Sequence, residues 1–569
     1  MTVQPLARAT PRAVVLAASV AVRHVSDDPV RALTLAWRAL PAPLRRAVRL
    51  AGPYGRAAAL WGAGDRRAAL TVLEAKPARL AAFSLAVDQP AVARSALARL
   101  PADSSAAPLL AARLSYREGQ LSAAIGALDG AAGWRSRRLR RSLRAEVDML
   151  TPGRLAAPVI PRADPVKGRV LHIVTDALPS VSAGYTVRTQ EIAVAQRAAG
   201  LDPHVVTRIG FPVTAGKVDG RHQVDVDGVA YHRLLPLVMP GRMDSVASQG
   251  LRHAARLVAQ VRPAVLHAAS NYSNALTAIA LREATGLPYV YEVRGFWEDT
   301  WLSRHAATAG LQASERYRLS RELEAHCMRS ADLVVTLGEA MRDEIIDRGV
   351  DPGKILIVPN GVSEDFLRPL PDGAALRAQL GIAPGELAVG LVSSLVAHEG
   401  IGTLLEAVRL LRDGGAAVRA LIVGDGPERA ALQRQASSLG IDAIFTGRVP
   451  LARVREYHAA LDVFVVPRTP DRVCQLVTPL KPVEAMASGL PVVVSAVRAL
   501  GEIVRDKVTG LQAAPQDPAA LADCLRELLE RPELRRELGR NAREWVAEGR
   551  TWQHNAQRYR EAYARLGAA

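Results

Sequence analysis

The middle of the chain alternates short, continuous apolar runs with amphipathic segments. Such runs are typical of strands buried on both faces of a parallel sheet, and the segments between them are typical of helices that cover the sheet. The candidate strands are residues 170–174, 203–208, 264–267, 289–293 and 333–336. We therefore predict a doubly wound α/β domain, which we place at residues 168–369.

The same alternation begins again after Asn360 and Gly361. Its candidate strands are residues 389–392, 420–423, 444–446, 463–466 and 492–494. We place this second Rossmann-like domain at residues 370–550 and expect it to face the first across a cleft, because open α/β sheets bind ligands at the carboxyl ends of their strands. A last helix at 551–566 is expected to pack back on the first domain.

Residues 1–152 lack this strand pattern and are dominated by Ala, Leu and Arg, which favours helices. Segments 58–70 and 113–125 resemble each other: each has a helix with an aromatic residue (Trp61, Tyr116), a glycine turn and an Ala-rich second helix. Two interpretations stay open, a degenerate tetratricopeptide-like array and a plain helical bundle. The Pro- and Ala-rich residues 153–167 are predicted to be a linker.

Positive charge is concentrated in the same segment. Residues 1–165 hold 25 Lys and Arg against 11 Asp and Glu, whereas the whole chain of 569 residues holds 73 against 56. The candidate partners of residues 1–152 are an anionic membrane surface and an acidic protein. The alternative is that the many arginines only reflect the overall amino-acid composition and bind no partner. Nucleic acid is not expected, because aromatic residues do not alternate with the arginines as a base-stacking surface requires.

Cysteine usage and hydropathy bear on location. Cys327, Cys474 and Cys524 are far apart and odd in number, which fits a reducing compartment. The longest early apolar stretch, at 13–22, has about half the length that a membrane span needs. We predict a cytoplasmic protein, with peripheral attachment to the inner face of the plasma membrane as an extension of that hypothesis.

Ordered motifs across 168–566 resemble those of one bacterial subgroup of the family 4 retaining glycosyltransferases. In the first domain they are the glycine loop at 176–188 (DALPSVSAGYTVR), the segment at 290–298 (VYEVRGFWE) and the interdomain turn at 358–361 (VPNG). In the second they are the segments at 423–427 (VGDGP), 445–449 (FTGRV) and 478–487 (TPLKPVEAMA).

This resemblance implies the two-lobed GT-B fold, here preceded by an all-α module. It further implies transfer of a sugar from a nucleotide diphosphate sugar to a glycan or lipid-linked acceptor, with retention at the anomeric carbon, in cell-envelope or exopolysaccharide biosynthesis. The alternatives are a nucleotide-sugar epimerase of the same fold and a catalytically weak, nucleotide-sugar-binding scaffold whose helical module recruits a partner.

The donor site implied by the resemblance draws on both lobes. Glu484, at a helix start, would accept hydrogen bonds from the ribose hydroxyls, while Lys481 and Arg472 would neutralise the pyrophosphate. The glycine loop at Gly184 would bring a helix N-terminus to a phosphate. The remaining donor-site predictions are Ser394, Gly424, Gly447, Gln475, Thr478 and Leu480.

The sequence departs from the general family pattern at four positions. Ser394 and Glu399 stand where typical members have Arg and Lys, Gln475 stands beside the position of a glutamate, and Ala496 replaces an aspartate. These departures keep the scaffold alternative open.

Three residues of the first lobe are candidates for catalysis. Arg294 occupies the position of a histidine in many relatives and cannot act as a base, so it would stabilise charge. Glu298, with Asp299, would orient acceptor hydroxyls, and His267 ends a strand of the same lobe. An interdomain salt-bridge cluster is the alternative for Arg294 and the two acids, and a core histidine is the alternative for His267.

No cofactor and no metal are expected. The sequence shows no carboxylate–histidine cluster with metal-site spacing, and Asp225 and Asp227 lie in a hairpin-like stretch at 223–233 that reads as surface. Helix N-termini and basic side chains can neutralise a pyrophosphate instead.

Overall fold

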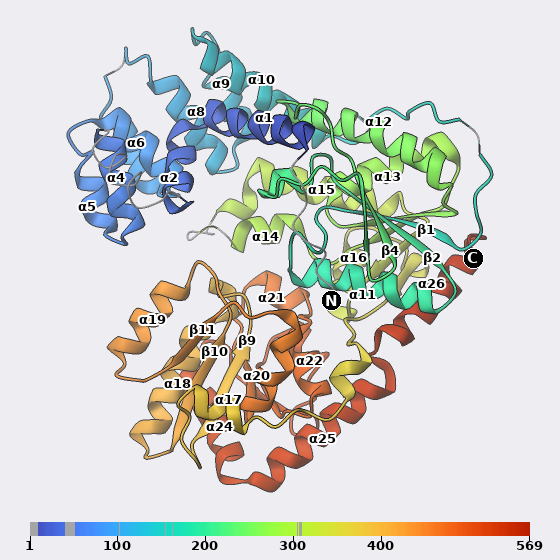
Figure 1. The fold of residues 1–569 in the computed structure, drawn as a ribbon. Helices are drawn as coiled ribbons and strands as arrows, with labels where there is room; N and C mark the ends of the chain where they lie inside the picture. Colours follow the sequence, from blue (N-terminus) through green and yellow to red (C-terminus); the bar gives the residue numbers. More distant parts are fainter. Residues whose placement is uncertain are drawn as a thin grey trace.

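The computed structural model describes residues 10–39, 52–101, 103–153, 155–161, 163–303, 305 and 310–569. Figure 1 shows three bodies: a helical module (blue), one lobe built on a sheet (green) and a second lobe built on another sheet (yellow to red). We name the two lobes the acceptor lobe and the donor lobe after the roles that the resemblance implies. The predicted fold class, two doubly wound domains preceded by an all-α module, is confirmed. Parts of the predicted module (1–9, 40–51, 102) and linker (154, 162) lie outside the described residues.

The helical module begins with two helices, α1 (Pro11–Asp27) and α2 (Pro29–Ala39), and continues as consecutive helical hairpins. The hairpins are α4 (Pro53–Gly62) with α5 (Arg66–Thr71), α6 (Pro77–Ala86) with α7 (Pro90–Ala98), and α8 (Ala107–Arg117) with α9 (Leu121–Gly126). Helix α10 (Trp134–Met149) ends the module. A proline occupies the first or second position of the first helix of each hairpin, where the missing N–H removes no hydrogen bond of the helix.

The described strands of the acceptor lobe form an eight-stranded sheet in the order β3-β4-β2-β1-β5-β6-β7-β8, parallel except for the β3–β4 hairpin. The strands are β1 (Arg169–Val174), β2 (Asp202–Thr207), β3 (Gln223–Val226), β4 (Val229–Arg233), β5 (Val265–Ala269), β6 (Tyr289–Glu292), β7 (Leu333–Thr336) and β8 (Ile355–Ile357). The helices are α11 (Gly184–Ala198), α12 (Met243–Val261), α13 (Tyr272–Thr285), α14 (Trp297–Ser303), α15 (Glu315–Arg329) and α16 (Glu339–Asp347). The strand order reverses beside β1, so the Gly184 loop that follows β1 lies where such sheets bind ligands.

The described strands of the donor lobe form a six-stranded parallel sheet in the order β11-β10-β9-β12-β13-β14. The strands are β9 (Leu387–Val392), β10 (Val418–Val423), β11 (Ile444–Gly447), β12 (Val463–Val466), β13 (Val492–Ser495) and β14 (Leu511–Ala513). The helices are α17 (Ala374–Gln379), α18 (Ile401–Asp413), α19 (Arg429–Ser438), α20 (Val454–Ala460), α21 (Arg472–Leu476), α22 (Lys481–Ala487), α23 (Arg498–Gly501), α24 (Pro518–Glu530) and α25 (Pro532–Gly549). Here the order reverses between β9 and β12, and this point faces the acceptor lobe.

The last helix, α26 (Trp552–Arg565), leaves the donor lobe and lies against the acceptor lobe (Figure 1). Thr551 caps it, and its aromatic side chains Trp552, Tyr559 and Tyr563 are buried in the core of the acceptor lobe. Burial of a side chain of this size contributes about 2–3 kcal/mol. Although α26 follows the donor lobe in sequence, the burial of its side chains therefore stabilises the acceptor lobe.

The helical module docks on the acceptor lobe through specific contacts. Glu315 accepts hydrogen bonds from the Ser122 backbone N–H over 2.6 Å and from the Ser122 hydroxyl over 2.7 Å. At the other end, Arg23 of α1 donates to the Pro240 carbonyl over 2.7 Å. Within the part of the chain that the structure describes, no helix combines the length and the apolar character needed to cross a bilayer.

Candidate active site

A cavity of about 380 Å³ lies between the two lobes, at the carboxyl ends of strands from both sheets. The acceptor lobe contributes the loop after β1 and Arg294 after β6, and the donor lobe contributes the ends of β9, β10 and β12 and the start of α22. Eight residues singled out in the sequence line it: Gly184, Arg294, Ser394, Gly424, Thr478, Leu480, Lys481 and Glu484.

The acceptor-lobe wall begins with the N-terminus of α11. Ala183 precedes the helix in extended conformation, and its N–H donates to the Thr186 hydroxyl over 2.9 Å. A Cβ added to Gly184 would meet no atom within 4 Å, so this glycine borders open space on the cavity side. A long helix that begins at a cavity wall presents backbone N–H groups and a positive dipole end to whatever binds there.

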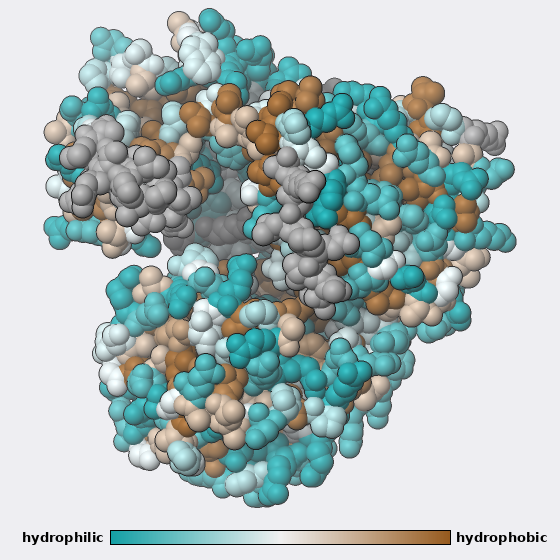
Figure 2. Space-filling view, in the orientation of Figure 1, coloured by the Kyte–Doolittle hydropathy of each residue, from teal (hydrophilic) through white to brown (hydrophobic). Residues whose placement is uncertain are grey.

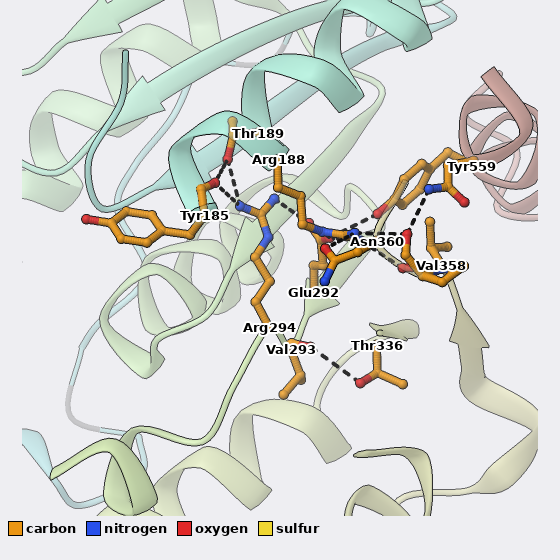
Figure 3. A network of polar contacts seen from close by, with 12 residues as sticks. Tyr185, Arg188, Thr189, Glu292, Val293, Arg294, Thr336, Val358, Asn360 and Tyr559 are labelled. Carbon is orange, nitrogen blue, oxygen red and sulfur yellow. Dashed lines mark hydrogen bonds and ion pairs between the residues drawn. The ribbon is translucent and has the colours of Figure 1, made fainter. Parts of the chain in front are cut away.

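Arg294 is held beside this loop by the buried carboxylate of Glu292, as Figure 3 shows. Its guanidinium donates to Glu292 over 2.6 Å, to the Tyr185 carbonyl over 2.9 Å and to the Thr189 hydroxyl over 2.7 Å. Arg188 reaches the other oxygen of Glu292 over 2.7 Å. Burial would raise the pKa of Glu292, but the two arginines bring it well below its usual range. The Arg294 side chain is therefore a positioned cation at the cavity wall.

The donor-lobe wall supplies further cations. Lys481 donates to the Ser393 hydroxyl over 2.7 Å, and Arg468, buried, pairs with Glu399 over 2.9 Å. Burial would raise the pKa of Glu399, but Arg468 and Lys481 bring it to about 2, so this acid stays ionised. Burial also lowers the pKa of Lys481, and Glu399 opposes that shift. Glu399 therefore keeps the two cations in place and charged.

Glu484 lies on the first turn of α22, half-buried at the cavity wall. Burial raises its pKa to about 7, Lys481 opposes the shift and Glu191 of the acceptor lobe adds to it. The Thr478 hydroxyl oxygen nearby is buried and has no hydrogen-bond partner among the described residues. Both groups can hydrogen-bond a ligand that enters the cavity.

Gly424 permits the close approach of two loops. Its φ is +139°, and a Cβ there would lie 1.7 Å from the Ser393 carbonyl oxygen. Only glycine allows the β10 turn to pack against the end of β9 in this way.

Five predicted site residues lie outside the cavity lining. Gly447 is the last residue of β11, and its carbonyl accepts from the N–H of Gly424 after β10 over 3.0 Å. Gln475 accepts from the Arg498 N–H over 2.9 Å. Arg472 does not reach the cavity and pairs instead with Asp299 over 3.2 Å and with Glu344 over 2.5 Å.

The other two residues are Glu298 and His267. Glu298 is buried and pairs with Arg348 of the same lobe over 2.6 Å, so the interdomain salt-bridge alternative describes Asp299, which pairs with Arg472, but not Glu298 or Arg294. His267 is fully buried, contacts Glu292 over 3.1 Å and Tyr563 over 2.6 Å, and has its pKa lowered by burial. His267 therefore lies in the environment expected for a buried core histidine.

Three arginines of the cavity lining, Arg188, Arg448 and Arg468, were not singled out in the sequence, and the last two have similar positions in the fold. Arg448 stands within the quoted segment at 445–449, and Arg468 follows the apolar run at 463–466, so both come just after a strand. A search for basic residues at the carboxyl ends of strands would have found them.

Two family models match this chain over the lobes that form the cavity. Residues 183–361 match the glycosyl transferase 4-like domain, and residues 372–545 match the glycosyl transferases group 1 domain. A D-inositol 3-phosphate glycosyltransferase of Nocardia farcinica is 36% identical over 274 residues, which are 46% of this chain and 58% of that protein. The chain belongs to the family 4 glycosyltransferases.

Other family relatives and solved structures extend the comparison. An α-maltose-1-phosphate synthase of Mycolicibacterium smegmatis is 28% identical over 272 residues, 44% of this chain and 68% of that protein. The chain spans little more than half the length of the first relatives, 58% and 55%. Sucrose-phosphate synthase from Thermosynechococcus elongatus superposes with a TM-score of 0.57 at 23% identity, over 70% of this chain and 99% of that one. HepE of Anabaena in complex with UDP-glucose superposes with a TM-score of 0.53 at 19% identity, over 70% and 99%. Both share the fold.

Proposed function

We propose that this family 4 glycosyltransferase transfers a sugar from a nucleotide diphosphate sugar to a glycan or lipid-linked acceptor in cell-envelope or exopolysaccharide biosynthesis. The observation that carries the proposal is the cavity between the lobes, which sets a cluster of cations opposite a carboxylate. Arg294, Arg448, Arg468 and Lys481 suit a pyrophosphate, and Glu484 suits the hydroxyls of a ribose. One structural neighbour fits this donor class, since HepE of Anabaena was solved with UDP and with UDP-glucose.

The proposed transfer retains the anomeric configuration. The bond between the sugar C1 and the β-phosphate oxygen breaks, the acceptor oxygen bonds to C1 on the same face, and the β-phosphate takes the acceptor proton. Arg294 and Lys481 stabilise the charge that develops on the leaving diphosphate. No metal has a part in this proposal, because positioned side chains and the α11 N-terminus supply the positive charge.

The first experiment is calorimetric titration of UDP, GDP and ADP sugars into the full chain and into Glu484→Ala. We expect one nucleotide to bind in the micromolar range and the variant to bind at least about tenfold more weakly, which is about 1.4 kcal/mol. Glu530→Ala, an exposed glutamate at the end of α24, is the matched control and should bind as the unaltered protein does. Absence of binding by any nucleotide sugar would overturn the proposed donor site.

Transfer itself is tested with the nucleotide sugar that binds, on a panel of glycan and lipid-linked acceptors. The anomeric configuration of the product by NMR tests retention. Donor binding without transfer to any acceptor would favour the scaffold alternative. That alternative is based on Gln475 and Ala496, which depart from the family pattern.

A further inference from the structure

A second cavity, of about 490 Å³, lies between the helical module and the acceptor lobe. We call it the module cavity. Its walls come from all three hairpins of the module, from α2, and from residues of the acceptor lobe after the 290–298 motif, among them Trp301 and Arg316. Figure 2 shows that the molecule is hollowed between the module and the donor lobe, and Figure 1 shows α14 lying between these two bodies.

The hairpins contribute corresponding positions to this cavity. Each hairpin turn contains a residue with left-handed backbone, Gly64 (φ +92°), Asp88 (φ +62°) and Gly119 (φ +73°). Trp61 and Tyr116 stand three residues before the turns of the first and third hairpins, and both line the cavity. The similarity of segments 58–70 and 113–125 thus has a structural consequence: helix pairs stacked side by side point equivalent residues toward one concave face. Stacked helical hairpins use such concave faces as binding surfaces.

Helix α14 follows a residue of the active-site cavity, Arg294, and carries a residue of the module cavity, Trp301. It begins three residues after Arg294, and its Trp297 and Trp301 are one helical turn apart on the same face. Trp297 is 36% exposed, whereas the next two residues are buried: Glu298 pairs with Arg348 of the same lobe, and Asp299 pairs with Arg472 of the donor lobe. Helix α14 is about 10 Å long at 1.5 Å per residue. The exposed Trp297 therefore stands in sequence between Arg294 at the active-site cavity and Trp301 at the module cavity.

The lining combines aromatic faces with three arginines, Arg31, Arg117 and Arg316, of which the last two already have carboxylate partners. Arg117 pairs with Asp88 over 3.3 Å, and Arg316 pairs with Glu146 over 3.1 Å while its guanidinium lies 5.0 Å from the Tyr116 ring and 5.8 Å from the Trp301 ring. Paired arginines act as oriented hydrogen-bond donors more than as free cations. A polyanion would find only Arg31 without a carboxylate partner among the described side chains, whereas a sugar has hydroxyls for the donors and an apolar ring face for the indoles.

We infer that the module cavity binds the oligosaccharide chain of the acceptor, several sugars away from the one being extended. The inference rests on the proposed function, and it assigns to the helical module the recognition of acceptor length. The acceptor end enters the active-site cavity, the chain passes along Trp297 and Trp301, and its distal sugars lie on Tyr116 and Trp61. A membrane-bound or free acceptor would be recognised by this same chemistry.

The test is binding of the full chain to an array of neutral and acidic oligosaccharides of four or more sugars, with a peptide array beside it. The variants Trp301→Leu and Arg117→Ala alter opposite walls of the module cavity. Trp134→Leu is the matched control, because Trp134 is 55% exposed at the start of α10 and lies outside both cavities. Circular dichroism and thermal melting verify that each variant folds, and Arg117→Ala is the fallback if loss of the indole unfolds α14.

We expect one class of oligosaccharide to bind, with at least tenfold loss in each cavity variant and none in Trp134→Leu. Glu484→Ala should bind the array like the unaltered chain, because Glu484 lies in the other cavity. Oligosaccharide binding can therefore be interpreted even if the proposed donor site is wrong. Three outcomes overturn the inference: no oligosaccharide binds, both cavity variants bind as strongly as the unaltered chain, or peptides are captured in a Trp301-dependent way while oligosaccharides are not. If calorimetry shows donor binding and any of these three outcomes is observed, the proposed function is retained and the role of the module cavity in acceptor binding is rejected.

Discussion

Arg472 of the donor lobe donates from its Nε to the Asp299 carboxylate of the acceptor lobe over 3.2 Å, and from a terminal nitrogen to Glu344 over 2.5 Å. Nearby, Arg498 pairs with Asp343, and Glu502 accepts from the N–H groups of Glu339 and Ala340 at the start of α16. These contacts join the lobes beside the active-site cavity. Arg472, which the resemblance places at the pyrophosphate, is therefore part of the inter-lobe interface.

Arg472→Ala should therefore open the lobes rather than remove a phosphate contact. We expect a larger radius of gyration in small-angle X-ray scattering, because Asp299 and Glu344 lose their partner in the other lobe. Arg409→Ala is the control, since Arg409 pairs with Asp413 on the exposed face of α18. An unchanged radius together with tenfold weaker donor binding would instead place Arg472 at the phosphates.

Donor affinity should depend on pH through Glu484, whose pKa burial raises to about 7. Ribose hydroxyls donate to the ionised carboxylate, and the diphosphate diester of a nucleotide sugar does not titrate in this range. Binding should therefore weaken by nearly tenfold as pH falls from 8 to 6, measured by calorimetry. Glu484→Gln should abolish the pH dependence and Glu530→Gln, at the exposed end of α24, should leave it; a pH-independent affinity in the unaltered chain would contradict this role.

The same residue should influence stability with a definite sign. The folded chain keeps the Glu484 proton up to about pH 7, whereas an ordinary glutamate loses it near pH 4.5, so the free energy of unfolding decreases as pH rises through that window. At pH 8 Glu484→Gln should melt at a higher temperature than the unaltered protein, and near pH 4 the two should melt alike. A lower melting temperature for the variant at pH 8 would show that the carboxylate is stabilised by partners instead.

The buried carboxylate of Glu292 should be important for the stability of the acceptor lobe. Glu292→Gln leaves Arg188 and Arg294 without their shared counter-charge, which should cost about 3–5 kcal/mol. Thermal unfolding followed by fluorescence measures the loss. Asp202→Asn, which breaks a surface pair with Arg169, is the control and should cost about 0–1 kcal/mol. Equal losses in the two variants would contradict the central role of Glu292.

Two glycines at the active-site cavity should respond differently to alanine. Gly424→Ala forces a Cβ against the Ser393 carbonyl oxygen and should lower stability by about 1–3 kcal/mol. Gly184→Ala meets open space, so its melting temperature should stay unchanged while donor binding weakens. Destabilisation by Gly184→Ala, or unchanged donor binding in that variant, would argue against a ligand at the start of α11.

Most of the fold could be predicted from the sequence, because each buried parallel strand is a local run of apolar residues. The predicted segments 170–174 and 463–466, for example, agree with β1 and β12 to within a residue. Strands β8 and β14 were not predicted, because each is a three-residue edge strand whose pairing with a neighbouring strand, rather than its own pattern, defines it. The paired aromatic residues Trp61 and Tyr116 were visible as a repeat, but not as two parts of one cavity wall.

The sequence by itself determined two α/β domains, a helical segment and the residue types that a nucleotide sugar needs, since patterning and motifs act over a few residues. The tertiary structure alone decided which charges meet. Arg472 and Arg468 both follow strand β12 within a few residues, yet Arg468 lines the cavity beside Glu399 and Arg472 reaches across to Asp299. A charged side chain is directed by partners far away in the sequence, because electrostatic attraction and burial depend on distance in space.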